Sequence, residues 1–402
     1  SQTVLSPAAL LAAHLWRLVT LRQPGDMDRQ PGRLGAPTFG FDPCRDRRDP
    51  VPAPPDMTLR DVISARIAAE GPMTIADYMA TCLLHPTMGY YSTRDPFGAA
   101  GDFTTAPEIT QMFGELIGLS LAQSWVDQGA PQDAVLVELG PGRGTLMADA
   151  LRATKAVPGF APDVHFVEAS PSLRALQAKA VPSATFHDDV ATLPDKPILL
   201  IANEFFDALP IRQFQRSGKA WRERVIGADL ALGLTDETNI PQLAHRLADT
   251  TDGQVVEHCP ALPAIIAEID KRIATHGGAA LIVDYGDWDS LGDTLQALQD
   301  HAPADPFSDP GTADLTAHVD FAAIAANVTQ SQFSRVTPQG VFLERLGITQ
   351  RAQILARGLK GDALNAHIAA HRRLTHPAEM GDLFKVIGIT PNKAPLLPGF
   401  AL

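Results

Sequence analysis

Cysteine is scarce in this sequence. The three cysteines, Cys44, Cys82 and Cys259, lie far apart among 402 residues, and none belongs to a C-x-x-C pair. An odd number of scattered cysteines disfavours both a disulfide framework and a zinc site. The chain also has no H-E-x-x-H motif, so we expect a protein of a reducing compartment that requires no metal.

Long apolar runs and an excess of basic charge are missing as well. The best candidate for a membrane span, residues 5–21, is interrupted by His14 and Arg17, whereas a span needs about 18 or more apolar residues. Lysine and arginine total 33 against 46 aspartates and glutamates, a net charge of −13. Nucleic-acid binding requires clustered basic side chains, so we expect neither a membrane span nor a nucleic-acid partner.

The first 56 residues differ from the rest of the chain. Residues 22–56 are rich in Pro, Gly, Arg and Asp and lack apolar periodicity, which is typical of a linker or a disordered tail. We predict an extension at 1–56, a helical and loop region at 57–130, and a larger domain with insertions at 131–402. An organellar presequence is an alternative for the extension, although its aspartates are unlike an acid-poor transit peptide.

Helical periodicity begins at Thr58. Leu59, Val62, Ile63 and Ile67 share one face of a predicted helix, which the following Gly-Pro pair ends. The stretch at 88–108 is rich in Gly, Pro and Thr and predicts a long ordered loop. Loops of that length often carry function.

The centre of the chain alternates strand-like and helical stretches. The apolar runs AVLVELG, VHFVEAS and PILLIANEFF are separated by the helical segments TLMADALRAT and PSLRALQAKA. This βαβαβ pattern is typical of a parallel sheet with helices on both faces. Two later strand candidates, AALIVDYG and LFKVIGIT, extend it, with a loop-rich stretch at 297–321 between them.

The glycine-rich turn ELGPGRG is the strongest motif. Glu138, Gly140, Gly142 and Gly144 lie between a predicted strand and a helix, where glycine lets the backbone approach a ligand closely. A dinucleotide fingerprint requires Gly or Ala three residues after Gly142, and this chain has Thr145. The remaining E-x-G-x-G-x-G pattern is that of class I methyltransferases, which bind S-adenosylmethionine; a plain tight turn is the alternative.

Acidic residues after the next two strands extend this cofactor hypothesis. Glu168 ends VHFVEAS, where a carboxylate can accept hydrogen bonds from both ribose hydroxyls. Asp188 and Asp189 follow the short strand candidate SATF and could reach the adenine amino group. A helix-capping role fits these two aspartates equally well.

Two carboxylates and two aromatic side chains follow the fourth strand in NEFFDALP. Open α/β sheets bind ligands at this edge, so Glu204 and Asp207 are candidates for the site of methyl transfer. Arginine stays protonated, and a guanidinium nucleophile therefore needs carboxylates that orient it and stabilise the charge left as its proton departs. The alternative is that both carboxylates are helix caps and that Phe205 and Phe206 belong to the core.

Five motifs together resemble the MidA-like family of methyltransferases. They are GYYSTRDPFGAAGDFTTAPEITQMFGELIG, ELGPGRGTL, NEFFDALP, VDYG and ADLTAHVDF, in this order, and the similarity extends from about Thr58 almost to the C-terminus. The resemblance implies a class I methyltransferase, Rossmann-like α/β fold, with a mostly parallel seven-stranded sheet and S-adenosylmethionine bound by residues 131–402. It also implies symmetric dimethylation of an arginine on a core subunit of respiratory complex I. We expect a cytoplasmic protein if the chain is bacterial and a mitochondrial matrix protein if it is eukaryotic.

The resemblance also implies roles for individual residues. The cofactor contacts would be Gly140, Gly142 and Glu168, with Gly101, Asp102 and Thr105 of the long loop near them. Glu204 and Asp207 would face the acceptor, helped by Asp284, His318 and Asp320. His318 could take the proton that leaves the nitrogen, although a hydrogen-bonded structural histidine is an equal alternative. Tyr90 and Tyr91 could pack on cofactor or substrate, or in the core.

Three functions from different classes are therefore open. The first is a protein-arginine methyltransferase, and the second is an assembly or scaffolding protein that keeps the cofactor fold but acts by binding a partner. The third is a nicotinamide-dependent oxidoreductase, which Thr145 disfavours.

Overall fold

Strands from the middle and the end of the chain form the main sheet. The computed structural model describes residues 57–93, 104–299 and 301–400, and within them this sheet has nine strands: β15-β17-β10-β5-β2-β3-β4, with β14 beside β10 and β16 beside β17. Neighbours from β10 to β4 pair in parallel, whereas β17 is antiparallel to β10. The bounds are β2 (Val135–Leu139), β3 (Asp163–Val167), β4 (Thr185–His187), β5 (Ile198–Asn203), β10 (Gly278–Asp287), β14 (Val319–Asp320), β15 (Gln332–Phe333), β16 (Thr337–Pro338) and β17 (Phe384–Thr390).

This mixed sheet corrects the predicted mostly parallel sheet of seven strands. The segment LFKVIGIT is a strand, as expected, but it runs against β10 over six residue pairs, from Ala280–Ile389 to Tyr285–Phe384. A central strand that is buried on both faces has the same continuous apolar run in either direction. Periodicity therefore could not reveal its orientation. The predicted extension at 1–56 lies outside the described residues, as do Gly101 and Asp102.

Helices cover both faces of the main sheet, as predicted. In β5, Leu199 and Ile201 face one core with α6, α7, α11 and α12, and Ile198 and Leu200 face a second core with α9 and α10. This alternation follows from the two-residue period of a strand. The bounds are α6 (Gln111–Asp127), α7 (Thr145–Thr154), α8 (Pro171–Ala180), α9 (Leu262–His276), α10 (Phe321–Ala326), α11 (Gln339–Arg345), α12 (Ile348–Leu355) and α13 (Gly361–Thr375).

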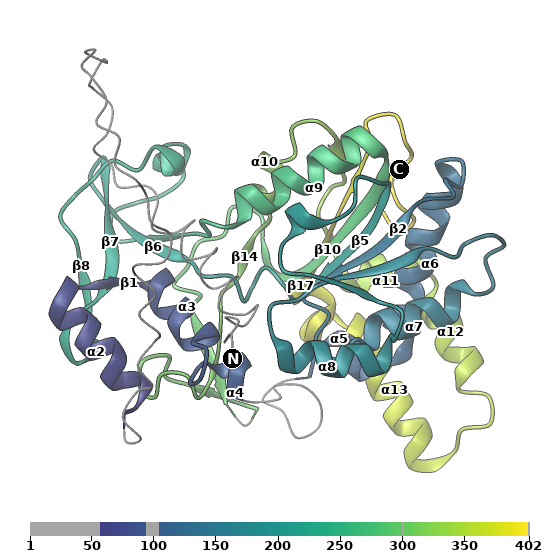
Figure 1. Cartoon of the computed structure of the whole chain (residues 1–402), viewed down its shortest axis with the longest axis horizontal. Coiled ribbons are helices and arrows are strands. Elements are labelled where there is room, and N and C mark those ends of the chain that lie inside the picture. Colours follow the sequence, from purple (N-terminus) through teal and green to yellow (C-terminus); the bar gives the residue numbers. More distant parts are fainter. Residues whose placement is uncertain (1–56, 94–103, 300, 401–402) are drawn as a thin grey trace, which may run out of the picture.

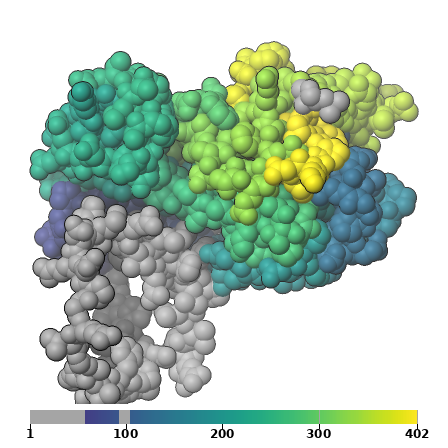
Figure 2. Space-filling model, turned by 90° about the horizontal axis from the view of Figure 1, so that it is seen from above, coloured from purple at the N-terminus to yellow at the C-terminus, as the bar shows by residue number. Residues whose placement is uncertain are grey.

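A smaller part of the molecule packs beside the main sheet. Its five-stranded sheet has the order β1-β7-β6-β9 with β8 beside β7, and the first helices lie against it, as the left side of Figure 1 shows. Seen from above, the inserted strands form a mass of their own beside the C-terminal part (Figure 2). The bounds are α2 (Leu59–Glu70), α3 (Ile75–Leu84), α4 (Tyr90–Thr93), β1 (Met73–Thr74), β6 (Arg212–Ser217), β7 (Ala220–Ile226), β8 (Leu232–Leu234) and β9 (Val255–His258). The short helix α5 (Ala106–Ile109) packs instead with α6 and α7 of the main part.

The first helix begins and ends where the sequence predicts. Thr58 caps α2 in a reciprocal capping box with Asp61, and Gly71 follows its last residue. The apolar face buries Ile63 and Ile67 against the smaller sheet, including Ile226 of β7. Within the described residues, no helix is both long enough and apolar enough to cross a membrane.

The stretch at 297–321 is more ordered than predicted. It contributes most of a three-stranded antiparallel sheet, in the order β12-β11-β13, formed by β11 (Gln296–Gln299), β12 (Ala302–Ala304) and β13 (Asp314–Thr316). Three or four residues are too few for an alternating pattern to emerge, and the prolines in this stretch favour a loop interpretation. Leu315 and Ala317 pack in the same core as α2 and α3. This sheet therefore ties the N-terminal helices to the loop that follows β10.

Candidate active site

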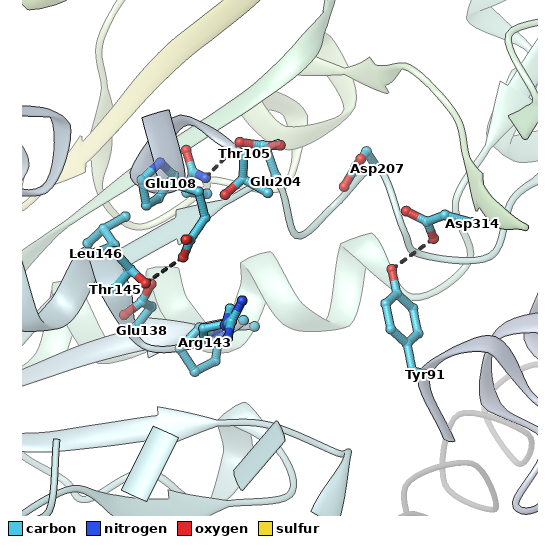
Figure 3. A pocket seen from close by; sticks show the side chains of 15 residues that line it. Tyr91, Thr105, Glu108, Glu138, Arg143, Thr145, Leu146, Glu204, Asp207 and Asp314 are labelled. Atoms are coloured by element: carbon cyan, nitrogen blue, oxygen red, sulfur yellow. Dashed lines mark hydrogen bonds between the residues drawn. The ribbon is translucent and has the colours of Figure 1, made fainter. Parts of the chain in front are cut away.

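A cleft lies at the carboxyl ends of β2 and β5. The chain passes from β2 to β3 on one side and returns to β5 on the other, and open α/β sheets bind ligands at such a switch point. The cleft encloses about 540 Å³, including its mouth. It is lined by Tyr91, Thr105, Pro107, Glu108, Glu138, Gly140, Pro141, Gly142, Arg143, Thr145, Leu146, Asn203, Glu204, Asp207 and Asp314, many of which Figure 3 labels.

The glycine-rich turn forms one wall of the cleft. Gly140 has a φ of 58°, in the left-handed region that favours glycine. A Cβ atom there would lie 2.9 Å from Cδ2 of Phe205, so the turn and the residues after β5 are in close contact. Gly144, with a φ of 82°, precedes the first residue of α7. The turn predicted from ELGPGRG is therefore present, between β2 and α7.

Three buried acceptor atoms in the cleft wall lack partners among the described residues. They are Oε2 of Glu138, Oδ1 of Asn203 and Oδ1 of Asp207, in residues that are 3%, 8% and 6% exposed. An unsatisfied buried polar atom costs about 1 to 3 kcal/mol. A ligand that carries N–H or O–H donors would satisfy these atoms.

Glu204 directs its carboxylate into the cleft from a strained backbone. Its φ is 50°, and its N–H donates to the carbonyl of Val283 at 2.9 Å. Its Oε1 accepts from the backbone N–H of Ala106 at 3.1 Å and from Nδ2 of Asn203 at 3.0 Å. Burial and the nearby Asp207 raise the pKa of Glu204 to about 7. A residue held in the left-handed region is typical of functional sites.

Asp207 and Asp284 are neighbours with different surroundings. Asp207 lines the cleft, and burial raises its pKa to about 6 although Tyr285 opposes the shift. Asp284 is fully buried and accepts backbone hydrogen bonds from Phe206 at 3.0 Å, Asp207 at 3.3 Å and Tyr285 at 2.9 Å. Burial, Asp207 and Glu204 raise the pKa of Asp284 well above its usual value. Asp284 does not line the cleft; it holds the turn that carries Asp207.

Glu168 lies beneath the glycine turn and is not among the lining residues. It accepts hydrogen bonds from the backbone N–H of Ser170 at 2.7 Å and from Nε2 of Gln177 at 2.9 Å. The same Nε2 donates to the carbonyl of Gly142 at 2.8 Å, so Glu168 is linked to the turn. Burial raises the pKa of Glu168.

The two aspartates predicted near the adenine have local partners. Asp188 forms an ion pair with Arg174 at 2.5 Å. Asp189 accepts from the backbone N–H of Ala191 at 2.8 Å and caps the short helix η1 (Val190–Thr192). The capping alternative is thus the observed role of Asp189, and neither aspartate lines the cleft.

His318 and Asp320 lie away from the cleft. The backbone N–H of His318 donates to Oγ1 of Thr294, and its ring packs edge-on against Tyr285. Asp320 caps α10, accepting from the N–H groups of Ala322 at 2.9 Å and Ala323 at 3.1 Å. This placement does not support the catalytic roles predicted for both residues. In β14, Val319 pairs with Gly286 and Asp320 pairs with Asp287 of β10, and neither His318 nor Asp320 lines the cleft.

Several cleft residues, among them Glu108, Arg143 and Asp314, were not predicted from the sequence. Tyr91, for which contact with cofactor or substrate and core packing were both open, lines the cleft and donates from its hydroxyl to Oδ1 of Asp314 at 3.0 Å. Oγ1 of Thr145 donates to Oε1 of Glu108 at 2.5 Å. Arg143 belongs to the glycine turn itself, so the motif could have indicated it. Asp314 lies in ADLTAHVDF, but no spacing distinguishes it from the other acidic residues of that stretch. Of the predicted loop residues, Thr105 lines the cleft and is buried.

A glycine turn beneath a ligand-binding cleft, at the switch point of an α/β sheet, defines a cofactor-dependent enzyme of the α/β class. Comparison with known proteins gives its family. The model of an S-adenosyl-L-methionine-dependent methyltransferase family matches residues 116–339. The chain is therefore a member of the MidA-like family of S-adenosylmethionine-dependent methyltransferases, and S-adenosylmethionine is its cofactor.

Individual relatives agree with this membership. The protein arginine methyltransferase NDUFAF7, mitochondrial, of Xenopus laevis is 35% identical over 365 residues, which cover 81% of this chain and 83% of that protein. The Homo sapiens protein of the same name is 33% identical over 382 residues, 86% of each chain. A Burkholderia thailandensis protein solved with S-adenosyl-homocysteine is 29% identical, with a TM-score of 0.71 over 85% of this chain and 94% of that one. Membership in this family argues against the third function considered, a nicotinamide-dependent oxidoreductase.

The placement of Asp320 leads to a first prediction. Replacing Asp320 by Ala removes the cap of α10 and the ion pair of Asp320 with the buried Arg246 at 3.7 Å, and it should lower the free energy of unfolding by at least about 1 kcal/mol, as measured by urea denaturation. Because this carboxylate faces α10, we expect the affinity for S-adenosyl-homocysteine and the rate of methyl transfer to change by no more than about twofold. A much larger loss of rate in a folded Asp320→Ala variant would instead support a catalytic role for Asp320.

Proposed function

We propose that this enzyme transfers the methyl group of S-adenosylmethionine to a guanidinium nitrogen of a protein arginine. The observation that carries the proposal is the pair of carboxylates, Glu204 and Asp207, beside the glycine turn in one buried cleft. An arginine side chain stays protonated, and buried carboxylates are the groups that would bind and orient it. The names of the curated relatives support an arginine acceptor.

The residues present fit the cofactor. S-adenosylmethionine carries an ammonium group, and the unpartnered side-chain oxygens of Glu138 and Asn203 offer hydrogen-bond acceptors to such a ligand. The absence of a side chain at Gly140 keeps the turn open where a Cβ would meet Phe205. We infer that the glycine turn, Glu138 and Thr105 hold the cofactor, while Glu168 supports the turn through Gln177.

In the proposed mechanism, the protein aligns the acceptor and stabilises charge. A bond forms between the guanidinium nitrogen and the methyl carbon as the bond from that carbon to sulfur breaks. The nitrogen must also lose a proton, and a carboxylate with a pKa near neutrality is suited to accept it. Glu204, whose pKa is about 7, is our candidate base, and Asp207 would orient the guanidinium. Exclusion of water from the cleft strengthens both interactions.

We further infer a class I methyltransferase sheet with added strands. The parallel series from β4 to β10, followed by the antiparallel β17, supports this inference. We propose that residues 131–402 bind the cofactor and that 57–130 supply part of the cleft through Tyr91, Thr105 and Glu108. The proposed acceptor is a core subunit of respiratory complex I, modified by symmetric dimethylation. The proposed location is the cytoplasm for a bacterial chain and the mitochondrial matrix for a eukaryotic one.

The acceptor can be tested directly. Complex I core subunits, purified from cells that lack the gene for this chain, are incubated with the enzyme and isotopically labelled S-adenosylmethionine. We expect label in symmetric dimethylarginine, identified by mass spectrometry. If the enzyme binds cofactor but leaves every arginine unlabelled, the alternative of a non-catalytic assembly protein is favoured.

The cofactor site has its own prediction. Changing Gly140 to Ala adds a Cβ 2.9 Å from Phe205 at a φ of 58°, and we expect the dissociation constant for S-adenosyl-homocysteine to rise at least about tenfold in isothermal titration, because the turn must shift to relieve this contact. Gly218→Ala is the matched control, because Gly218 has a φ of 57° with no atom near its Cβ position. Equal affinities in the two variants would argue against this turn as the cofactor site.

A further inference from the structure

The carboxylate of Glu204 is held in part from outside the main sheet. Its Oε1 accepts a hydrogen bond at 3.1 Å from the backbone N–H of Ala106, the first residue of α5. It also accepts one at 3.0 Å from Nδ2 of Asn203, which ends β5 and is the neighbour of Glu204 in the chain. Because Ala106 belongs to a distant segment, its N–H fixes the carboxylate relative to the opposite wall of the cleft.

Helix α5 is too short to be stable by itself. It has four residues, and its N-cap Thr105 makes no side-chain hydrogen bond to it. Ala106 is fully buried and Ile109 is partly buried in the core that includes α6 and α7. A single helical turn gains little from its own hydrogen bonds. The position of α5 therefore depends on its contacts with neighbouring elements.

A second hydrogen bond joins α5 to the end of the glycine turn. Oε1 of Glu108 accepts from Oγ1 of Thr145 at 2.5 Å, as Figure 3 shows. Thr145 is the first residue of α7 and directly follows Gly144. Hydrogen bonds to a carboxylate are stronger than those between neutral groups. Helix α5 thus contacts the glycine turn through Glu108 and the residue after β5 through Ala106.

We propose that the hydrogen bond between Glu108 and Thr145 holds α5 where the N–H of Ala106 orients Glu204 toward the acceptor nitrogen. Glu108 and Thr145 are then positioning residues, an inference that rests on the proposed role of Glu204 as the base. A glutamate side chain has several rotatable bonds, so its carboxylate can leave the acceptor if one of its donors moves away. Misplacement of a reacting group by about 1 Å can lower a rate by roughly 100-fold.

Two substitutions remove the bond from opposite sides. Thr145→Val deletes the donor and keeps the branched shape, and Glu108→Ala deletes the acceptor. Each should speed hydrogen exchange of segment 104–110 at least about tenfold, as measured by mass spectrometry, the factor expected for loss of a hydrogen bond to a charged group. Each should also lower single-turnover methyl transfer to the arginine acceptor about 10- to 100-fold at saturating cofactor.

Conservative variants and a matched control accompany these substitutions. Thr145→Ser keeps the donor and Glu108→Gln keeps an acceptor oxygen, so both should recover most of the rate and of the protection from exchange. Thr154→Val makes the same change as Thr145→Val at the other end of α7, where the hydroxyl donates to the carbonyl of Ala150 at 2.9 Å. We expect this control to leave the rate and the exchange of 104–110 unchanged.

A double variant tests whether the effect passes through Glu204. In the Glu204→Gln background, Glu108→Ala should lower the rate further by no more than about twofold, because α5 then has no base to orient. If the two losses multiply instead, α5 acts on another part of the cleft and the inference is overturned.

The remaining outcomes separate this inference from the proposed function. If Thr145→Val and Glu108→Ala keep the wild-type exchange and rate while Glu204→Gln is inactive, positioning through α5 is overturned and the proposed base stands. A loss of rate in Glu108→Ala but not in Thr145→Val would overturn it in favour of a direct contact between Glu108 and a ligand. Wild-type methyl transfer by Glu204→Gln would overturn both the base and its positioning.

Discussion

Replacing Glu204 by Gln, or Asp207 by Asn, lowers the rate of methyl transfer by about 100- to 1,000-fold, the loss seen when a preorganised electrostatic group is removed from an active site. Both changes keep the shape of the side chain and remove its charge. Both carboxylates line the cleft, so each variant loses an interaction with the acceptor cation. The measurement is single-turnover transfer of labelled methyl to the arginine acceptor at saturating cofactor.

Affinity for S-adenosyl-homocysteine is the control for this result. We expect the Glu204→Gln variant to stay within about threefold of the wild type, because the glycine turn remains intact. If both variants transfer the methyl group at the wild-type rate, neither carboxylate has a role in the reaction. A loss of cofactor affinity as large as the loss of rate would instead assign Glu204 to the cofactor site.

The rate should also depend on pH in a definite direction. Burial raises the pKa of Glu204 to about 7 and that of Asp207 to about 6, and the ionised forms are those that bind a cation. The wild-type rate should therefore be highest well above pH 7 and should fall as the pH decreases through 7 and 6. Because the two groups interact, the apparent pKa values belong to the pair.

The second large effect concerns Asp284. Replacing it by Ala leaves the backbone N–H groups of Phe206, Asp207 and Tyr285 without their acceptor in a fully buried position. Each unsatisfied group costs about 1 to 3 kcal/mol, so the free energy of unfolding should fall by at least about 3 kcal/mol. The turn after β5 then loses its fixed position, and methyl transfer should be lost with it.

Asp284→Asn is the informative companion variant. Asparagine keeps one side-chain oxygen and should retain part of the stability, as measured by urea denaturation at pH 7.5. If Asp284→Ala unfolds at the same urea concentration as the wild type, the three hydrogen bonds contribute little to the free energy of unfolding. A stable Asp284→Ala variant without activity would point instead to a direct role for this carboxylate in the cleft.

The sequence predicts those helices and strands whose local pattern of apolar residues and caps is sufficient to define them. Helix α2 has an apolar face, an N-cap at Thr58 and a terminating glycine, and its bounds follow. The strands β2 and β5 are buried on both faces and their sequences are continuous apolar runs, whereas β3 buries Val164 and Phe166 on one face. The orientation of β17 and the short strands β11 to β13 depend on pairing with distant segments, which no local pattern contains.

The same distinction applies to the cleft. Gly140, Glu204 and Asp207 directly follow long buried strands, and the topology of an α/β sheet brings such residues together. The catalytic roles of His318 and Asp320 were predicted from the resemblance of ADLTAHVDF to a family motif. In the structure, Asp314 of this motif lines the cleft, whereas Asp320 caps α10. Asp314 reaches the cleft because β13 pairs with β11, and no local pattern in the sequence predicts this pairing.

The pairing of β1 with β7 also has a consequence for synthesis of the chain. Met73 pairs with Ile226, and Ile63 and Met79 share a core with Ile211 and Leu315. At roughly 5 to 20 residues per second, the ribosome needs about 8 to 30 seconds to reach β7 after completing β1. The N-terminal helices wait through that interval with their apolar faces uncovered. Helices α2 and α3 therefore stay uncovered for longer than segments that pack against their sequence neighbours, and a chaperone that binds exposed apolar surface would act on them.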